Sequence, residues 1–344
     1  KCGVTLMNII LDGYFDQNFG DDMMQLMVVN GLKQHDFYVW HQQREMLAHL
    51  EGVENVHITN EFPAIDAYVN VIGTGFQFNG KRAAVEKILN ISKQKEYPKS
   101  AVIGCSIEPV NGWISNLLTK RELRRYGLIS CRDNISFAYI NRNCPRSEVK
   151  LHQDILFSIR GSIPKPGEHC LGVSITRRVY GSDNYRYYQV IAQCCDDYID
   201  KYQEKVLLFA FDSGLENDIS AALSVRKMML RPDMTEIIAY HSDPEDLISH
   251  FAKCSKIIGS RFHSVVLSLV LGIPIIAVYD TAKLKRLCEN FEIPSFKREI
   301  VTARELTALV ESIEKPAVLP AAVSDDACGH IRDLSTYLEH SNGR

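Results

Sequence analysis

The chain has 344 residues, more than one hydrophobic core usually supports, so its length predicts two domains. A net charge of −3 excludes the strongly basic composition that nucleic-acid-binding proteins use against phosphates. The longest apolar run, Val265–Val278, is interrupted by Gly272 and Pro274 and is shorter than the ~20 residues that cross a bilayer, so we expect no membrane-spanning helix.

Strands and helices alternate through the first half of the chain. Apolar runs of strand length separate stretches of helical periodicity, some of which begin with acidic residues. The predicted strands are Val4–Leu11, Phe37–Trp40, Val56–Thr59, Ala67–Ile72, Ala101–Ile107, Leu128–Cys131 and Val149–Leu156. The predicted helices are Asp21–Leu32, Lys81–Ser92, Trp113–Tyr126 and Ile135–Asn141.

A polar stretch rich in glycine and proline, Gly161–Gly167, predicts a linker, after which the alternation restarts. The predicted strands are Leu171–Ile175, Val206–Phe211, Glu236–Tyr240, Lys256–Gly259 and Ile273–Val278. The predicted helices are Tyr185–Tyr202, Glu216–Met229, Pro244–Cys254 (with Asp243 as N-cap), Val265–Leu271, Ala303–Ile313 and Asp325–Leu338.

This pattern predicts an α/β fold of two Rossmann-like parallel-sheet domains that face each other across a cleft. We expect an N-terminal domain over residues 1–160 and a C-terminal domain over residues 168–315. Residues 316–344 are expected to form a C-terminal helix that packs back on the first domain. Ligands of such sheets bind beyond the carboxyl ends of the strands, so side chains at those ends are the candidates for a site.

The segment Ser260–His263 lies where a strand leads into a buried helix. Unpaired N–H groups and the helix dipole attract anions there, and Arg261 adds a fixed positive charge to the titratable imidazole of His263. These residues indicate a site for an anionic small molecule. The alternative is an arginine that caps a neighbouring helix and a histidine packed under a loop.

Other polar residues follow predicted strands or begin helices and are candidates for substrate binding. They are Asn18, Gly20, Asp21, Arg132, Arg177, Asp212, Ser260 and Lys283. Two of these features also have a structural interpretation: the Asn18–Asp21 stretch as a capped turn, and Arg132 as one partner of a surface pair with Asp133 or another neighbouring acid. We expect His152 and His241 to be structural.

The sequence indicates neither a metal site nor a cofactor. There is no HxxxH or HExxH pair, the loop GYFDQNFG does not fit GxGxxG, and a P-loop is missing. Ten cysteines without a CxxC pair predict free thiols in a reducing compartment. Because Lys1–Leu11 does not have the layout of a signal peptide, we expect a cytoplasmic protein, integral to no membrane but able to act at its inner face.

Three segments, in order, resemble the polysaccharide pyruvyltransferase family: GYFDQNFGDD at Gly13–Asp22, ISCRDNIS at Ile129–Ser136 and GSRFHSVVLSLVLGIPIIAVYDTAK at Gly259–Lys283. One extra residue separates Asp280 from Lys283 in comparison with the family pattern. The resemblance implies a glycosyltransferase-B-like pair of domains, with the sugar acceptor on the first domain and phosphoenolpyruvate on the second. It also implies a ligand-binding arginine at Arg132.

The resemblance therefore implies a transferase that forms a pyruvate ketal on a sugar of a cell-envelope polysaccharide or its precursor, with phosphoenolpyruvate as co-substrate and phosphate as product. Planar arginine side chains suit a donor that carries a carboxylate and a phosphate, and His263 is the expected general acid. Two alternatives remain open: a glycosyltransferase that uses a nucleotide sugar, and a non-catalytic homologue that binds sugars or anions. The acceptor could be lipid-linked or polymeric, and the chain could form an oligomer.

Overall fold

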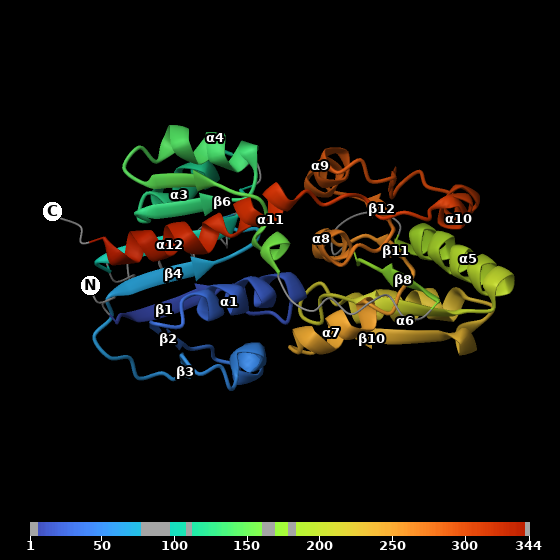
Figure 1. The fold of residues 1–344 in the computed structure, drawn as a ribbon, viewed down its shortest axis with the longest axis horizontal. Helices are drawn as coiled ribbons and strands as arrows, with labels where there is room; N and C mark the ends of the chain where they lie inside the picture. The colour runs from blue at the N-terminus through green and yellow to red at the C-terminus, as the bar shows by residue number, and fades with distance from the viewer. Residues whose placement is uncertain (1–5, 77–96, 108–111, 160–168, 178–183, 341–344) are drawn as a thin grey trace. The chain divides into compact units, whose positions relative to one another are not determined.

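This computed structural model describes residues 6–76, 97–107, 112–159, 169–177 and 184–340 (Figure 1). The chain divides into two compact units. Unit 1 consists of Lys1–Phe15, Asp21–Ser158 and Ala322–Arg344, and unit 2 consists of Asp16–Gly20 and Ile159–Ala321. The predicted helix Lys81–Ser92 and the predicted linker Gly161–Gly167 lie outside the described residues.

Unit 1 is built on a seven-stranded parallel sheet with the order β3-β2-β1-β4-β5-β6-β7. Its described strands are β1 Asn8–Gly13, β2 Asp36–Val39, β3 Val56–Ile58, β4 Ala67–Val71, β5 Lys99–Cys105, β6 Leu128–Cys131 and β7 Glu148–Leu151. Its described helices are α1 Phe19–Gly31, η1 Arg44–Leu50, α3 Trp113–Leu123, α4 Asn134–Asn143, η2 Ile155–Ser158, α11 Ala321–Ala327 and α12 Gly329–Glu339. The first two residues of α1 and the first of α11 are grouped with unit 2.

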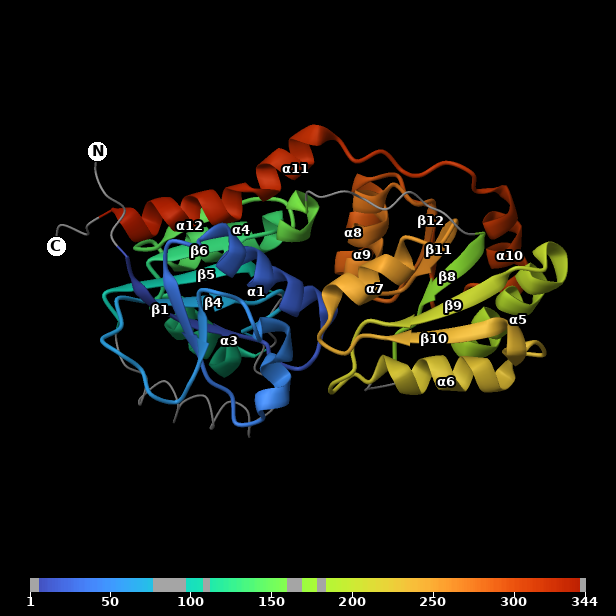
Figure 2. The same cartoon turned by 60° about the horizontal axis from the view of Figure 1, so that its bottom comes forward.

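The C-terminal helix α12 runs along β5 and β6 of unit 1 (Figure 2). Its Leu334 and Leu338 are fully buried, and the Lys99 ammonium donates to the carbonyl of Leu338 at the end of the helix. At the other end, the His152 ring lies between two carboxylates, 3.0 Å from Asp326 and 2.8 Å from Asp333. Apolar burial and charge pairing thus attach this last segment to the first sheet, and His152 has the structural role that the sequence predicted.

Unit 2 is built on a six-stranded parallel sheet with the order β10-β9-β8-β11-β12-β13. Its described strands are β8 Cys170–Ser174, β9 Lys205–Ala210, β10 Thr235–Ala239, β11 Lys256–Gly259, β12 Ile275–Tyr279 and β13 Ser295–Lys297. Its described helices are α5 Asn184–Tyr202, α6 Asp218–Met228, η3 Pro232–Met234, α7 Pro244–Phe251, α8 Phe262–Leu271, α9 Ala282–Asn290 and α10 Ala303–Ser312.

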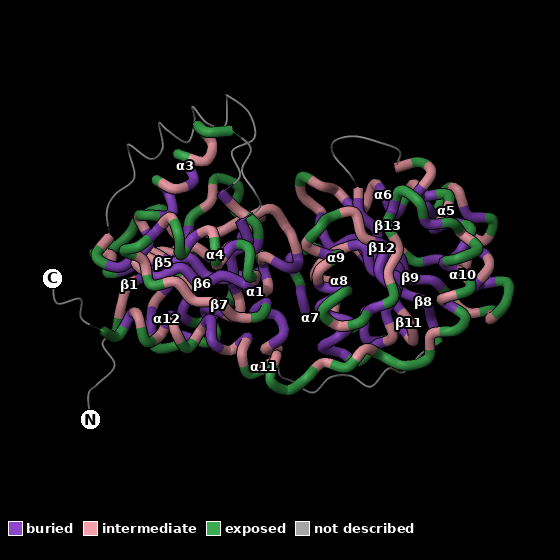
Figure 3. The backbone as a smooth tube through the Cα atoms, turned by 90° about the horizontal axis from the view of Figure 1, so that it is seen from above, coloured by how far each residue is buried: buried purple, intermediate pink, exposed green. Residues whose placement is uncertain are grey.

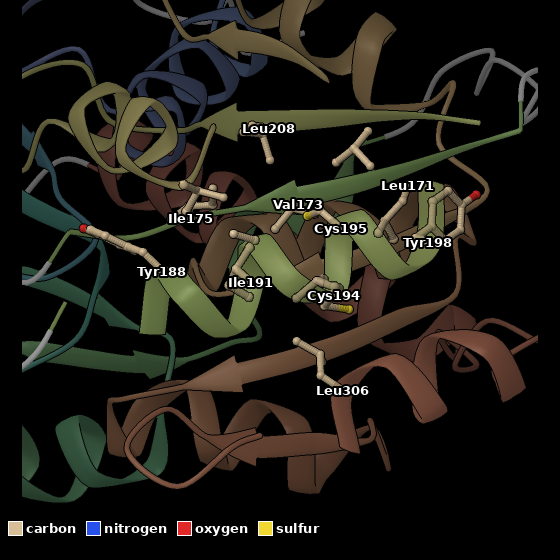
Figure 4. Packing of buried hydrophobic residues seen from close by; sticks show 14 of the residues in the cluster. Leu171, Val173, Ile175, Tyr188, Ile191, Cys194, Cys195, Tyr198, Leu208 and Leu306 are labelled. Carbon is tan, nitrogen blue, oxygen red and sulfur yellow. The ribbon is translucent and has the colours of Figure 1, made fainter. Parts of the chain in front are cut away.

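The core of unit 2 lies between its sheet and the apolar side of α5. Figure 4 shows Ile191, Cys194 and Cys195 of α5 beside residues of β8. Every residue of β8 is buried. Strands that are covered on both faces have nearly continuous apolar sequences, and for this reason the run Leu171–Ile175 predicted a strand here. Burial raises the pKa of Cys194 to about 12, so this thiol packs as a small neutral apolar group.

The structure corrects several element boundaries. The predicted strand Val149–Leu156 is wrong in its second half, because β7 ends at Leu151 and Ile155–Ser158 forms a 3₁₀ turn. The short strand β13 and the helix α9 were not predicted. Among the described residues, no helix is both long enough and apolar enough to cross a membrane.

Candidate functional site

The strand order of unit 2 reverses at β8, which pairs with β9 on one side and with β11 on the other. Segments that follow these strands meet at the carboxyl edge of the sheet, where ligands of open parallel sheets bind. Arg177 follows β8, and Ser260, Arg261 and His263 follow β11. The predicted candidates are thus brought together, and the Ser260 hydroxyl donates to the carbonyl of Ser174 over 2.8 Å.

Arg261 is the N-cap residue of α8, and its guanidinium reaches two acids at the start of α6. Its Nε and Nη2 donate to the two carboxylate oxygens of Asp218 over 2.8 and 2.7 Å, and its Nη1 pairs with Glu216. Burial alone would lower the pKa of Arg261, but these carboxylates outweigh it and raise the pKa. These contacts are ion pairs between side chains, which differ from the helix cap of the structural interpretation, and neither acid had been predicted from the sequence.

The two acids differ in exposure. Asp218 is fully buried and also accepts hydrogen bonds from the backbone N–H groups of Asp212 and Arg177, so it ties the ends of β8, β9 and β11 together. The side chain of Glu216 is 44% exposed. The guanidinium therefore has a fixed inner edge and an outer edge whose partner can move into solvent.

Asp212 follows β9 and is almost fully buried. One of its carboxylate oxygens accepts from the backbone N–H groups of Glu216 and Asn217, both over 3.2 Å. The other accepts from the Asn18 amide over 3.0 Å. Burial raises the pKa of Asp212 to about 6, even though Arg261 and Asn18 favour the ionised form.

Asn18 and Gly20 form the capped turn that the sequence predicted. The Asn18 side-chain oxygen accepts from the Gly20 N–H over 3.0 Å, at the start of α1. A methyl group added at Gly20 would lie only 1.6 Å from Nδ1 of His263, so the imidazole packs directly on the glycine. Asp212 therefore holds Asn18, Asn18 holds the turn, and the turn supports the ring of His263.

Lys283 approaches the same segment from the first turn of α9. Its Nζ lies 4.0 Å from the centre of the Phe262 ring, a cation–π distance, and the ring of His263 meets that of Phe262 edge-on, with centres 5.3 Å apart. Thr281 caps α9 by accepting from the N–H of Leu284. The irregular spacing after Asp280 thus still brings Lys283 to the Arg-x-His segment.

Arg132 lies at the carboxyl edge of the other sheet, after β6 of unit 1. Its Nη1 pairs with Asp154, its Nε donates to the Ser106 hydroxyl over 3.1 Å, and its side chain is 2% exposed. The structural alternative of a surface pair with Asp133 or another neighbouring acid is corrected in two respects: the pair is buried, and its acid is Asp154, while Asp133 caps α4 by accepting from the Ser136 N–H.

Asp21, also in unit 1, accepts a hydrogen bond from the backbone N–H of Gly73, 2.9 Å away, just beyond β4. Gly73 lies at the reversal point of this sheet, where β1 pairs with both β2 and β4. A side chain at Gly73 would overlap the guanidinium of Arg132, since an added methyl group would lie 2.8 Å from Nη2. The two candidates Asp21 and Arg132 therefore share one end of unit 1.

Arg298 is a buried cation that the sequence did not single out. Its Nη1 donates to the Thr176 hydroxyl over 2.9 Å, and its guanidinium lies 4.0 Å above the Tyr187 ring and 3.6 Å from Asp280. No pattern pointed to it, because it follows the unpredicted strand β13. Within the described ranges, no group of three or more His, Cys, Asp or Glu side chains is arranged to hold a metal ion.

Comparison with known proteins supports the predicted family and fold. The model of the family described as polysaccharide pyruvyl transferase matches residues 20–280, which confirms the resemblance. No curated protein matches the chain in sequence.

Solved structures resemble the fold over almost the whole chain. The UDP-GlcNAc 2-epimerase from Neisseria meningitidis, bound to UDP-GlcNAc, has a TM-score of 0.62 at 9% identity, covering 96% of this chain and 100% of that one. The UDP-GlcNAc 2-epimerase from Methanocaldococcus jannaschii has a TM-score of 0.60 at 8% identity, with the same coverage. Anabaena Alr3699/HepE, in complex with UDP and glucose, has a TM-score of 0.54 at 10% identity, covering 97% and 95%. These likenesses establish the predicted fold class, two parallel-sheet α/β domains of the glycosyltransferase-B type.

Proposed function

Because the chain belongs to the polysaccharide pyruvyl transferase family, we propose that it transfers the three-carbon skeleton of phosphoenolpyruvate to two hydroxyls of a sugar. The product is a cyclic pyruvate ketal, and inorganic phosphate is released. The observation that carries this proposal is the arrangement at the end of β11, where Arg261, His263 and Lys283 lie around Phe262 at the reversal point of the sheet.

The donor carries a carboxylate and a phosphate, and its recognition requires positive charge. In the proposal, an anionic group of the donor replaces Glu216 on the outer edge of Arg261, while Asp218 keeps the guanidinium in place. Lys283, over the ring of Phe262, and the N-terminus of α8 add positive potential to this segment. Glu216, with its half-exposed side chain, is the partner that can leave.

His263 is proposed as the general acid. It delivers a proton to the methylene carbon of phosphoenolpyruvate, which becomes a methyl group, and the adjacent carbon becomes electrophilic. One sugar hydroxyl adds to this carbon, and a second displaces phosphate. Two C–O bonds form and the C–O bond to phosphate breaks. Of the two hydroxyl protons, one replaces the proton that His263 gave and the other leaves with phosphate.

The remaining candidates are proposed to support this chemistry rather than perform it. Asp212 and Asn18 position the glycine turn under His263, because their polar atoms already bind each other and the backbone. Arg132 and Asp21 are proposed to order the carboxyl edge of unit 1, on which the sugar acceptor would bind. Ser260 and the backbone of Arg177 hold the strand ends.

The test is phosphate release from phosphoenolpyruvate in the presence of candidate sugar acceptors, including lipid-linked ones. We expect His263→Ala to lower turnover by about 10²–10⁴-fold while changing donor affinity little, because a general acid acts mainly in the transition state. Exposed His241 provides the matched control, and His241→Ala should keep wild-type turnover. In D₂O, the methyl group of the ketal should contain one deuterium. Wild-type turnover in His263→Ala would refute the assignment.

A nucleotide-sugar enzyme is the second candidate, because structures of the same fold contain UDP-GlcNAc or UDP and glucose. Isothermal titration of the chain with phosphoenolpyruvate and with UDP-sugars separates the two proposals. Heat from UDP-sugars alone would favour the second. Donor binding without phosphate release, across the acceptors tested, would favour a non-catalytic homologue.

A further inference from the structure

Helices α3 and α4 of unit 1 expose large apolar side chains where they begin. Trp113, Ile114 and Leu117 of α3 are 77%, 46% and 57% exposed, and Ile135 of α4 is 46% exposed. Figure 3 colours the start of α3 as exposed. Scattered apolar residues are normal on protein surfaces, but three within five residues of one helix leave a contiguous apolar end in water.

Two hydrogen bonds align the helices side by side. The Tyr139 hydroxyl of α4 donates to the Asn116 side chain of α3 over 2.5 Å. Farther along, the Arg124 guanidinium just after α3 donates to the carbonyl of Asn143 at the end of α4 over 2.9 Å. The helices therefore run in the same direction, and their apolar starts lie at one common end.

The other end of the same pair is basic. Six cationic side chains lie in the second halves of the two helices or just beyond: Lys120, Arg121, Arg124, Arg125, Arg142 and Arg146. Of the two acids in this stretch, Glu122 is buried and Asp133 caps α4. Residues 112–146 contain seven basic and two acidic side chains, a formal charge of +5 in a chain of net charge −3. The remainder of the chain thus carries eight net negative charges.

Helical spacing places the apolar and basic residues on one face. Leu117, Arg121 and Arg124 are related by intervals of four and three residues, and the last two are also exposed. Ile135 and Arg142 are exposed and two turns apart on α4. A helix that carries Trp and Leu together with Arg on its exposed side is typical of segments that lie in the interface of a bilayer.

We propose that the α3–α4 surface, formed by Trp113, Ile114, Leu117 and Ile135 with the six cations, docks on an anionic lipid bilayer. The apolar ends would enter the headgroup region, and the cations would lie within one Debye length of the lipid phosphates. The charge distribution favours this occupant over a second copy of the chain, because the two positive patches of a symmetric dimer would repel each other. Since the rest of the chain carries net negative charge, an anionic surface would attract this basic region more than the chain as a whole.

Tryptophan fluorescence of the full chain tests the proposal without reference to turnover. The sequence contains two tryptophans, and Trp40→Phe leaves Trp113 as the only one. With vesicles of phosphatidylcholine and phosphatidylglycerol, we expect the emission of this variant to shift to the blue and to be quenched by brominated acyl chains. Vesicles of phosphatidylcholine alone should cause little change. The reciprocal Trp113→Phe variant should show no shift from Trp40.

Co-sedimentation with the same vesicles separates the apolar and ionic contributions. Trp113→Ser with Leu117→Ser should lower the partition coefficient at least tenfold, and each of Arg121→Gln and Arg124→Gln should lower it about fivefold. Leu230→Ser and Lys227→Gln change exposed residues of unit 2 and should have no effect. Equal binding by all variants, no binding to anionic vesicles, or a dimer that Trp113→Ser dissociates would overturn the proposal.

Discussion

Arg132 and Arg261 each come just after a parallel strand at the carboxyl edge of their sheet, Arg132 after β6 and Arg261 after β11, which adjoins the reversal point. In unit 1, Arg132 and its partner Asp154 have side chains that are each 2% exposed. In unit 2, Arg261 is 16% exposed, and its outer partner Glu216 reaches solvent. An arginine at the carboxyl end of a parallel strand therefore forms a sealed pair in one unit and a half-open pair in the other. The half-open pair is the one that can exchange its partner for a ligand.

The groups whose pKa values are shifted by burial also differ between the two units. In unit 1, burial lowers the pKa of His49 and of His330 to about 4. In unit 2, burial raises the pKa of Asp212 to about 6 and also raises the pKa of Asp218. Each group favours its neutral form, but a histidine loses its proton to become neutral, whereas a carboxylate gains one. Acidification should therefore act on the two units in opposite directions.

The largest expected effect comes from opening the sealed pair. Asp154→Asn removes the carboxylate that pairs with the buried charge of Arg132, so the free energy of unfolding should fall by about 3–5 kcal/mol. Urea denaturation measures this loss. Asp133→Ala, which removes only the cap of α4, should cost about 1 kcal/mol. Equal losses in the two variants would mean that the Arg132 pair is not sealed.

Acidification from pH 6.5 to 4.5 should change the stability of the two units in opposite directions. Unfolded histidines take up protons in this range and buried His49 and His330 do not, so unit 1 should lose about 4 kcal/mol of stability, half of it from each histidine. Native Asp212 takes up a proton at higher pH than it does when unfolded, so unit 2 should gain about 2 kcal/mol. Amide hydrogen exchange, corrected for its intrinsic rate, follows each unit separately.

The variant Asp212→Asn provides the control for this pH dependence. It should reduce the gain in unit 2 and leave the loss in unit 1 unchanged, because the Asp212 carboxyl is removed while Asp218, whose pKa burial also raises, remains. Stability changes of the same sign in both units of the wild type would contradict the assignment of these groups.

Arg261→Lys should weaken phosphoenolpyruvate binding about tenfold although the charge remains, because a lysine cannot hold both oxygens of Asp218 and present a second edge. Isothermal titration measures the change. Arg304→Lys, at an exposed position of α10, is the matched control and should bind the donor like the wild type. Unchanged affinity in Arg261→Lys would remove Arg261 from the donor site.

The smallest expected effect comes from the outer partner. Glu216→Gln removes the carboxylate that competes for Arg261, so donor affinity should rise about threefold while the unfolding free energy changes by less than ~0.5 kcal/mol. The exposed Glu236→Gln on β10 should change neither quantity. Weaker donor binding in Glu216→Gln would show instead that this carboxylate contributes to the site.

Local patterns were sufficient to predict most elements and the two-domain fold. Apolar runs such as Val206–Phe211 form strands, and Asp243 caps α7 as predicted, by accepting from the N–H of Asp246. The Asn18–Asp21 stretch likewise predicted a capped turn, because the hydrogen bond between Asn18 and Gly20 spans only two residues. Interactions over such short separations depend little on where the rest of the chain lies.

The side-chain pairing at the sheet edges was decided only by the tertiary structure. Arg132 pairs with an acid 22 residues away, and Arg261 with acids 43 and 45 residues away, on elements that adjoin only because β8 lies between β9 and β11. No local propensity determines that strand order, which depends on how the two faces of each sheet are covered. The sequence thus indicated that Arg261 and His263 stand at a strand end, and the packing of the sheet determined that Asp218, Glu216 and Gly20 surround them.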